Sequence, residues 1–336
     1  MHNFLASQPQ LNVHNPAVQD ALLATTQFWL ERGVDGFRFD AINFAMHNPA
    51  LTDNPPFPPG QGKRTRPFDF QDKIHNQSQP EIPAFLTRLR KLADRVGVET
   101  GQARFLVAEV GGDRANEEMK LYTQGDDRLH SAYGFLYLYA DRLTTELVDR
   151  GPAMWPGAEG EGWPSWTFSN HDAPRAVSRW AEERDERQTA AMCMLLLMCL
   201  RGNVFIWEGE ELGLPQAHVP YDRLVDPEAI ANWPETLGRD GARTPMPWTA
   251  EAPWAGFSTT EPWLPVDPRH LALSVSGEEA DPASPLHLSR RLIGLRRLYP
   301  TLRTGGMTMR EVGSSLLVFE RGSGPEALLC VFNLGH

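Results

Sequence analysis

Hydrophobic positions along the chain follow two alternating periods, one typical of helices and one typical of strands. In residues 81–96 the apolar positions are spaced three or four apart, which places them on one face of a helix. Similar spacing, with Val18, Leu22, Phe28 and Trp29 on one face, predicts a helix that begins at Asn15-Pro16. Residues 188–200 are apolar on all sides, as in a buried helix. Short apolar runs predict strands at residues 34–39, 104–108, 133–139, 166–169 and 203–207.

Strands that alternate with helices predict a parallel α/β architecture. Residues 45–80 are rich in Pro, Asn, Gln and Gly and predict a long loop, a feature that is often functional. Beyond residue 300 the pattern changes, and residues 314–320 and 327–333 predict β-strands. We therefore expect a catalytic α/β domain over residues 1–300 and the beginning of a β domain over residues 301–336.

Composition and charge narrow the class of partner. The net charge is −11, and this acidic balance argues against a nucleic-acid partner, which requires clustered Lys and Arg. The most apolar stretch, residues 190–200, is too short to cross a bilayer, and residues 1–12 do not have the pattern of a signal peptide. Three cysteines without framework spacing favour a reducing compartment, so we expect a cytoplasmic protein with a small-molecule substrate.

Three carboxylates follow short apolar runs: Asp40, Glu109 and Asp172. One such residue alone is as well explained as a helix cap. Three of them at the C-terminal ends of parallel strands are harder to explain structurally, because a β/α barrel places its active site there. Paired carboxylates are what glycoside hydrolysis requires, since one attacks the anomeric carbon and the other protonates the leaving oxygen.

The residues beside these carboxylates refine their predicted roles. Arg38 precedes Asp40 by two positions, so both side chains should lie on one side of the strand, where the guanidinium keeps the carboxylate ionised. Ala108 and Val110 flank Glu109, and desolvation there would raise the pKa of its carboxyl towards that of a general acid. His171 could bind sugar hydroxyls, although alone it fits a structural histidine equally well.

The set of motifs resembles glycoside hydrolase family 13, the α-amylase superfamily, and in particular its α-glucosidase and oligo-1,6-glucosidase branch. Residues 8–12 (QPQLN) resemble the QPDLN motif before the fourth barrel strand, with Gln10 in place of the common Asp. The segment GFRFD at 36–40, Glu109 and the NHD segment at 170–172 resemble the motifs of strands four, five and seven. The resemblance to the branch also rests on residues 209–213 (GEELG) and on residues 238–248, which resemble its RTPMQW signature.

The resemblance implies a (β/α)8 barrel, of which strands four to eight are present, and a retaining enzyme that needs no cofactor. Asp40 would be the nucleophile and Glu109 the general acid/base, about 5–5.5 Å apart. Asp172 would bind the 2- and 3-hydroxyls of glucose, with Arg38 and His171 assisting. Arg239 would contact the same sugar, unless it pairs with Asp240 or another acid instead. Ala41, where the branch has Val in α-1,6 enzymes, favours α-1,4 substrates such as maltose.

Departures from the family pattern predict a truncated chain. The first three barrel strands, the strand-three motif and most of the domain that follows it are absent, and the β domain stops early. We therefore expect the isolated chain to be inactive. Within the resemblance, a sucrose isomerase or trehalose-forming transglucosylase stays open, because it would share these carboxylates. A non-catalytic relative and an unrelated metal-dependent barrel are disfavoured by the three carboxylates and by the lack of metal-ligand motifs.

Overall fold

The computed structural model describes residues 1–58, 67–182, 184–236, 238–313 and 315–335. The chain divides into two compact units, each with its own core. The first comprises residues 1–135 and 159–164, and the second comprises residues 136–158 and 165–336. Residues 59–66 of the predicted long loop lie outside the described residues.

The first unit is built on a parallel sheet of β1 (Gly36–Phe39), β2 (Phe105–Val110) and β3 (Ser131–Gly134), in that order. Gly36 is paired with Phe105 at the start of β1, where a Cβ atom would lie 1.7 Å from the Phe105 carbonyl oxygen. Only glycine fits this approach, which explains the first residue of the GFRFD segment. The parallel sheet confirms the strands predicted at residues 34–39 and 104–108.

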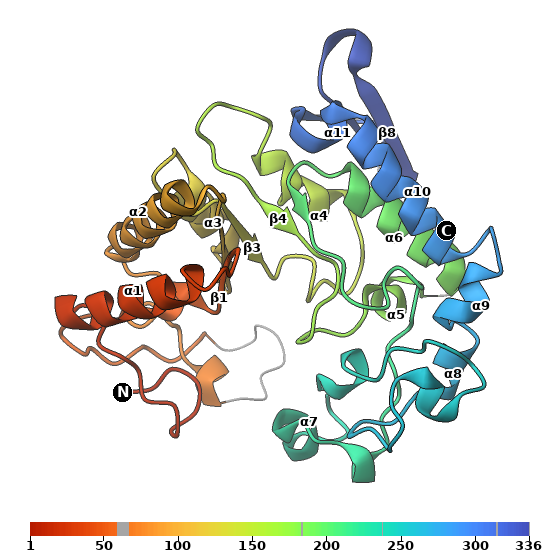
Figure 1. Ribbon diagram of the computed structural model, residues 1–336, viewed down its shortest axis with the longest axis horizontal. Helices are drawn as coiled ribbons and strands as arrows, with labels where there is room; N and C mark the ends of the chain where they lie inside the picture. Colours follow the sequence, from red (N-terminus) through yellow and green to blue (C-terminus); the bar gives the residue numbers. More distant parts are fainter. Residues whose placement is uncertain (59–66, 183, 237, 314, 336) are drawn as a thin grey trace. The chain divides into compact units, whose positions relative to one another are not determined.

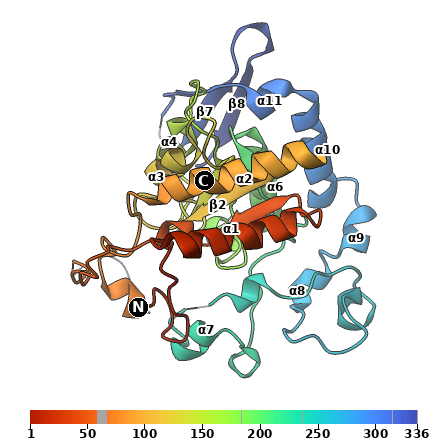
Figure 2. The same ribbon diagram turned by 60° about the vertical axis from the view of Figure 1, so that its left-hand side comes forward.

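Helices α1 (Pro16–Leu30), α2 (Ile82–Thr100) and α3 (Ala115–Thr123) cover this sheet, and α1 and α2 lie side by side in both ribbon views (Figures 1 and 2). Asn15 caps α1 through its side chain, which accepts a hydrogen bond from the backbone N–H of Ala17. Gly101 ends α2 in the left-handed conformation, with φ 70°. These signals confirm the predicted helices and their starts.

The buried face of α1 differs from the predicted one. The residues of α1 that are buried are Thr26 and Leu30, whereas Phe28 and Trp29 are 45% and 47% exposed. Phe28 and Trp29 contact each other edge to face, and the guanidinium of Arg32 lies over the Phe28 ring. Periodicity alone identified the helix but chose the wrong face, because an amphipathic pattern is overridden by the contacts that the rest of the chain offers.

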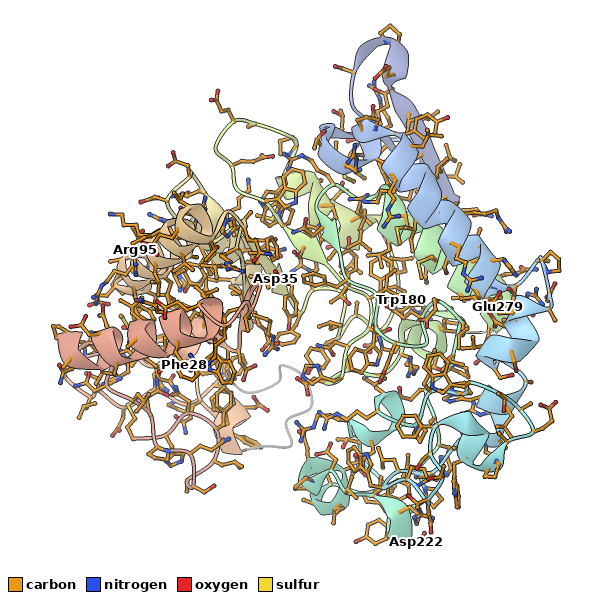
Figure 3. The ribbon with its side chains drawn as sticks, in the orientation of Figure 1. Phe28, Asp35, Arg95, Trp180, Asp222 and Glu279 are labelled. Carbon is orange, nitrogen blue, oxygen red and sulfur yellow. The ribbon has the colours of Figure 1, made fainter. Side chains whose placement is uncertain are left out.

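The second unit contains the parallel pair β4 (Ser165–Trp166) and β5 (Asn203–Val204). Both strands are shorter than the runs predicted at 166–169 and 203–207. Buried aromatic rings pack edge to face beside them, and one of these, Trp180, is labelled in Figure 3. The rings of this cluster belong to Tyr137, Trp155, Trp166, Phe168 and Trp180.

Helix α6 (Glu186–Cys199) is the buried helix predicted at 188–200, and it packs against α10 (Pro285–Leu298). The thiols of Cys193 and Cys199 are buried and unpaired, as expected from their apolar surroundings. The other helices of this unit are α4 (Thr145–Asp149), α5 (Ala176–Trp180), α7 (Pro227–Ala231), α8 (Pro268–Leu271), α9 (Val275–Glu279) and α11 (Pro300–Thr304).

The C-terminal segment forms an antiparallel sheet of β6 (Met307–Arg310), β7 (Leu316–Arg321) and β8 (Leu328–Asn333). The strands predicted at 314–320 and 327–333 correspond to β7 and β8, and β6 is an additional strand. Arg321 is buried and donates hydrogen bonds to the carbonyls of Gly306, Thr301, Gly305 and Cys199. These bonds fix the sheet to the end of α6. The domain boundary at residue 300 stays a prediction.

Candidate active site

Three polar side chains lie at one level across the C-terminal edge of the first sheet. Phe39 pairs with Ala108, so the next residues of the two strands, Asp40 and Glu109, are also level. Glu109 in turn pairs with Tyr133 on β3. Because side chains alternate between the faces of a strand, residues at one level of neighbouring parallel strands point to the same side. The register therefore forms a row of Asp40, Glu109 and Tyr133.

Arg38 joins the members of this row. One terminal nitrogen of its guanidinium, Nη1, lies 2.5 Å from Oδ1 of Asp40. The other, Nη2, contacts Oε2 of Glu109 and also donates to the Tyr133 hydroxyl at 2.8 Å. The prediction that Arg38 and Asp40 point to the same side of the strand is confirmed. Both carboxylates thus contact a single guanidinium group.

The members of the row differ in their exposure. The Asp40 side chain is 79% exposed, whereas Glu109 and Tyr133 are buried. Burial, followed by the neighbouring Glu109 carboxylate, raises the pKa of the Tyr133 hydroxyl above its usual range. Burial would lower the pKa of Arg38, but the hydrogen bonds with Tyr133 and Asp40 and the charge of Glu109 raise it overall. The arrangement therefore holds a permanent cation between an open carboxylate and an enclosed one.

The residues after Asp40 form a fixed turn. Ala41 has φ 40° and ψ 43°, in the left-handed region that non-glycine residues seldom adopt, and it precedes a 3-10 helix at Ile42–Phe44. The side-chain amide of Asn43 is buried and donates to the Gly111 carbonyl at 2.7 Å and to Glu118 at 2.9 Å. Burial raises the pKa of the Glu118 carboxyl despite this bond.

Gln10 has a local role that the sequence did not reveal. Its side-chain amide donates to the carbonyls of Phe44 and Ala45 at 2.8 and 3.2 Å, while its oxygen accepts from Asn3. A carboxylate cannot donate, so the Asp that is common in the family would leave these carbonyls without this partner. The QPQLN segment therefore supports the turn that carries Ala41.

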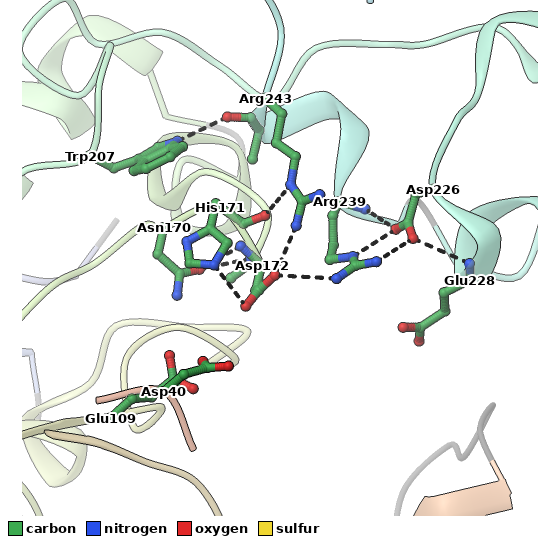
Figure 4. A network of polar contacts seen from close by, with 12 residues as sticks. Asp40, Glu109, Asn170, His171, Asp172, Trp207, Asp226, Glu228, Arg239 and Arg243 are labelled. Atoms are coloured by element: carbon green, nitrogen blue, oxygen red, sulfur yellow. Dashed lines mark hydrogen bonds and ion pairs between the residues drawn. The ribbon is translucent and has the colours of Figure 1, made fainter. Parts of the chain in front are cut away.

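In the second unit, the NHD segment forms a tight turn after β4 rather than part of the strand. The Asn170 side chain accepts hydrogen bonds from the backbone N–H groups of Asp172 and Ala173, both at 2.9 Å. This Asx turn fixes the backbone of Asp172. The ring of Trp207 lies 5.9 Å from that of His171, and the indole N–H donates to the Ala242 carbonyl (Figure 4).

Asp172 is held by three cationic or basic side chains. Its Oδ1 accepts from Arg243 Nη2 at 2.9 Å and lies 3.6 Å from Arg239 Nη1, and its Oδ2 lies 3.2 Å from His171 Nε2. Arg243 also donates to the His171 carbonyl, which ties both residues of the turn to one guanidinium. These contacts fix the position of the Asp172 carboxylate.

Arg239 is itself fixed by a buried acid. It donates through Nε and Nη2 to the two carboxylate oxygens of Asp226, at 3.1 and 2.7 Å. These bonds raise the pKa of Arg239. Burial would raise the pKa of Asp226, but the bonds from Arg239 lower it overall. The acid that pairs with Arg239 is therefore Asp226 and not Asp240, whose Oδ2 accepts from the backbone of residues 225 and 226.

The structure brings the predicted residues together in two groups. Arg38, Asp40, Glu109 and Ala41 meet at the edge of the first sheet, and the second group lies around Asp172, His171 and Arg239. Sequence reasoning missed Tyr133, Arg243 and Asp226. Arg243 lies within residues 238–248, which resemble the RTPMQW signature, and could have been found there, whereas no motif marks Tyr133 or Asp226. Among the described residues, no cluster of acidic, His and Cys side chains is arranged as a metal site.

Comparison with known proteins gives the class to which the fold and these groups belong. The model of the α-amylase catalytic domain matches residues 1–305, and the chain belongs to this family. The α/β fold of the α-amylase type is confirmed by the crystal structure of the α-glucosyl transfer enzyme XgtA, which has a TM-score of 0.91 and 39% identity over 99% of this chain. A trehalose-6-phosphate hydrolase from Bacillus licheniformis has a TM-score of 0.84 at 24% identity and the same coverage, and therefore supports the fold alone.

Curated relatives indicate the branch. A probable α-glucosidase from Rhizobium meliloti is 44% identical over 99% of this chain, and an oligo-1,6-glucosidase from Parageobacillus thermoglucosidasius is 30% identical over 100%. The chain spans 61% and 63% of the length of these two relatives and 62% of XgtA. None of the helices in the described part of the chain is long and apolar enough to span a bilayer.

Proposed function

We propose that the protein hydrolyses terminal α-linked glucose from short α-glucosides with retention of configuration. The observation that carries this proposal is the register of β1 and β2, which makes Asp40 and Glu109 level on neighbouring strands. Neighbouring strands lie about 4.8 Å apart. Retaining enzymes hold their two carboxyl groups about 5–5.5 Å apart, whereas inverting enzymes need about 6.5–9.5 Å to admit a water molecule. The register therefore favours the retaining mechanism.

In the first step, a carboxylate oxygen of Asp40 attacks the anomeric carbon and the glycosidic bond breaks. The bonding electron pair passes to the leaving oxygen, which takes a proton from Glu109. In the second step Glu109 accepts a proton from water, the water oxygen bonds to the anomeric carbon, and Asp40 leaves with its electron pair. Arg38 orients Asp40 before the attack, because its guanidinium contacts that carboxylate directly.

Asp172 is proposed to bind two neighbouring hydroxyls of the glucose. Support comes from its fixed turn and from its contacts with Arg243 and His171, which orient the carboxylate. A carboxylate hydrogen-bonded to sugar hydroxyls strengthens its bonds as positive charge develops on the ring. Arg239, oriented by Asp226, is proposed to contact the same sugar through its remaining N–H groups. Ala41 beside the nucleophile supports a preference for α-1,4 linkages.

A second candidate is glucosyl transfer to an acceptor other than water. The relative that favours it is XgtA, an α-glucosyl transfer enzyme at 39% identity. Transfer and hydrolysis share the first step and differ only in the acceptor of the second. The cytoplasm is the proposed location, supported by three unpaired, buried cysteines, which persist in reducing compartments.

The test uses the protein as its gene encodes it, with p-nitrophenyl α-glucoside and maltose as substrates. Asp40→Ala should abolish turnover. Glu109→Gln should lose most activity and should be partly rescued by azide, with α-glucosyl azide as the product. The anomer of the first glucose released, read by NMR, should be α. Release of β-glucose would refute retention, and a high ratio of disaccharide to glucose at raised substrate concentration would identify the transferase.

A further inference from the structure

The proposed function assigns no role to Tyr133, although its hydroxyl lies at the centre of the first group of site residues. It donates to Glu109 Oε2 at 2.6 Å and accepts from Arg38 Nε and Nη2 at 3.1 and 2.8 Å. The parallel pairing of Glu109 with Tyr133 fixes the two Cα atoms side by side. Both side chains are buried, so their hydrogen bond is protected from competition by water.

The direction of this hydrogen bond follows from the chemistry of its partners. A guanidinium has donors and no acceptor, so both contacts with Arg38 oblige the tyrosine oxygen to accept. The Tyr133 proton is then directed to Glu109, whose Oε2 also receives Nη2 of Arg38. An oxygen that accepts from two donors cannot at the same time carry the proton that the mechanism transfers.

We propose, on the basis of the proposed function, that Tyr133 is a positioning residue for the acid/base, because its hydroxyl holds Oε2 of Glu109 as an acceptor and assigns proton exchange to Oε1. Glu109 thereby presents one defined oxygen to the leaving oxygen in the first step and to the attacking water in the second. Tyr133 also stabilises the carboxylate form, which is the form that must act as a base in the second step.

The other charged groups around Glu109 allow the effect of Tyr133 to be separated from theirs. Arg38, which lies on β1, contacts Glu109 through Nη2 and Asp40 through Nη1. From α3, which also packs against β2, Glu118 is bound by Asn43 and lies 3.8 Å from Arg114. The hydrogen bonds from Arg38 to the Tyr133 hydroxyl are lost with that hydroxyl in Tyr133→Phe. The contacts of Arg38 with Asp40 and Glu109 and those of Glu118 with Asn43 and Arg114 do not involve the hydroxyl.

The first test is titration of the Glu109 carboxyl carbon by NMR, with Glu109→Gln used to assign the signal. Tyr133→Phe removes a donor to the charged form, so the midpoint should rise by about one pH unit. Tyr137→Phe is the matched control, because Tyr137 is also buried and its hydroxyl has no hydrogen-bond partner among the described residues. That variant should leave the midpoint unchanged. An unchanged midpoint in folded Tyr133→Phe would overturn the proposal.

A second variant covers the case in which Tyr133→Phe does not fold. Site-specific incorporation of 3,5-difluorotyrosine at position 133 keeps the ring and its packing but makes the hydroxyl a stronger donor. The midpoint should then fall relative to wild type, in the opposite direction to the phenylalanine variant. A midpoint that does not move would show that the hydroxyl has no influence on the Glu109 carboxyl.

Kinetics separate positioning from general damage. Departure of fluoride from α-glucosyl fluoride needs little protonation, whereas departure of glucose from maltose depends on Glu109. For Tyr133→Phe, kcat/KM should fall at least about tenfold on maltose and less than about threefold on the fluoride. Equal losses on both substrates would contradict the positioning role. A wild-type protein that hydrolyses neither substrate but shows the titration shift would instead refute the proposed function and leave the Tyr133 assignment standing.

Discussion

Glu210 allows a stability measurement to test the electrostatics of the second unit. The residue follows Trp207 in the turn after β5, and its Oε2 accepts the backbone N–H of Trp207 at 2.7 Å. Burial raises the pKa of Glu210 to about 7, against hydrogen bonds from Trp207 and Ser169 and the charges of Arg175 and Arg179. Glu210→Gln keeps the shape of the side chain and its acceptor but removes the ionisation.

The sign and size of the effect follow from the difference between the folded and unfolded states. The pKa of an ordinary Glu is 4.5, below the pKa of about 7 that Glu210 has in the folded state. The folded state therefore binds the proton more readily than the unfolded state. The resulting stability is fully present below about pH 4.5 and is lost as pH rises to about 7. The interval corresponds to about 3 kcal/mol of unfolding free energy. Glu210→Gln has no carboxyl to titrate at this position and so does not lose this contribution. Its free energy of unfolding relative to that of wild type should therefore rise by about 3 kcal/mol between pH 4.5 and pH 8.

Urea unfolding followed by circular dichroism at several pH values from 4.5 to 8.5 measures this difference. Glu278, whose pKa burial also raises to about 7, titrates in the same window, so the comparison of interest is variant minus wild type at each pH. Glu251→Gln, at an exposed carboxylate, is the control and should give a curve parallel to wild type. If the Glu210→Gln curve were also parallel, burial would not govern this carboxyl and the reasoning would be wrong.

Two further substitutions test the support of Asp40. Gln10→Glu replaces the amide that donates to the carbonyls of Phe44 and Ala45 by an acceptor. The variant should be less stable than wild type by about 1–3 kcal/mol in thermal melts at neutral pH. An unchanged melting temperature would contradict the assigned hydrogen bonds. Ala41→Gly should raise the melting temperature, because glycine adopts the positive φ of this position without strain. Wild type should prefer maltose to isomaltose, and Ala41→Val should move kcat/KM towards isomaltose; a wild type that is equally efficient on both would refute the linkage assignment.

Helices were predicted well where the sequence alone determines the buried face. In α2 the buried residues coincide with the predicted apolar face: Ile82, Phe85, Leu86, Leu89, Leu92, Ala93 and Val96. In α1 the pattern predicted one face with Phe28 and Trp29, and the structure buries Thr26 and Leu30 instead. The choice depends on which surface meets the helix, and a period of 3.6 residues carries no information about that surface.

The same distinction applies to the candidate site, where contacts set by spacing along one strand could be predicted and contacts set by packing could not. Arg38 and Asp40 could be placed together from the sequence, because two positions on one strand always face the same side. Tyr133 could not, since its meeting with Glu109 depends on the register between strands separated by a helix and a loop. Asp226 likewise lies 13 positions before the arginine that it holds, in a segment without regular periodicity. Partners that are joined by packing rather than by spacing need coordinates.

The retaining mechanism that we propose is supported by the order of the strands rather than by the motifs. Each motif fixes a side chain only relative to its own strand, and neither GFRFD nor the residues around Glu109 contains information about their separation. Because β1 and β2 are neighbours in register, the backbones that carry Asp40 and Glu109 are one strand spacing apart, about 4.8 Å. Asp40 and Tyr133 are separated by two spacings, about 10 Å, which exceeds the separation of about 5–5.5 Å at which a carboxyl acts as the retaining partner. In the proposed retaining mechanism the second carboxylate therefore belongs on β2, the neighbour of β1, and Tyr133 on β3 contacts Glu109 instead.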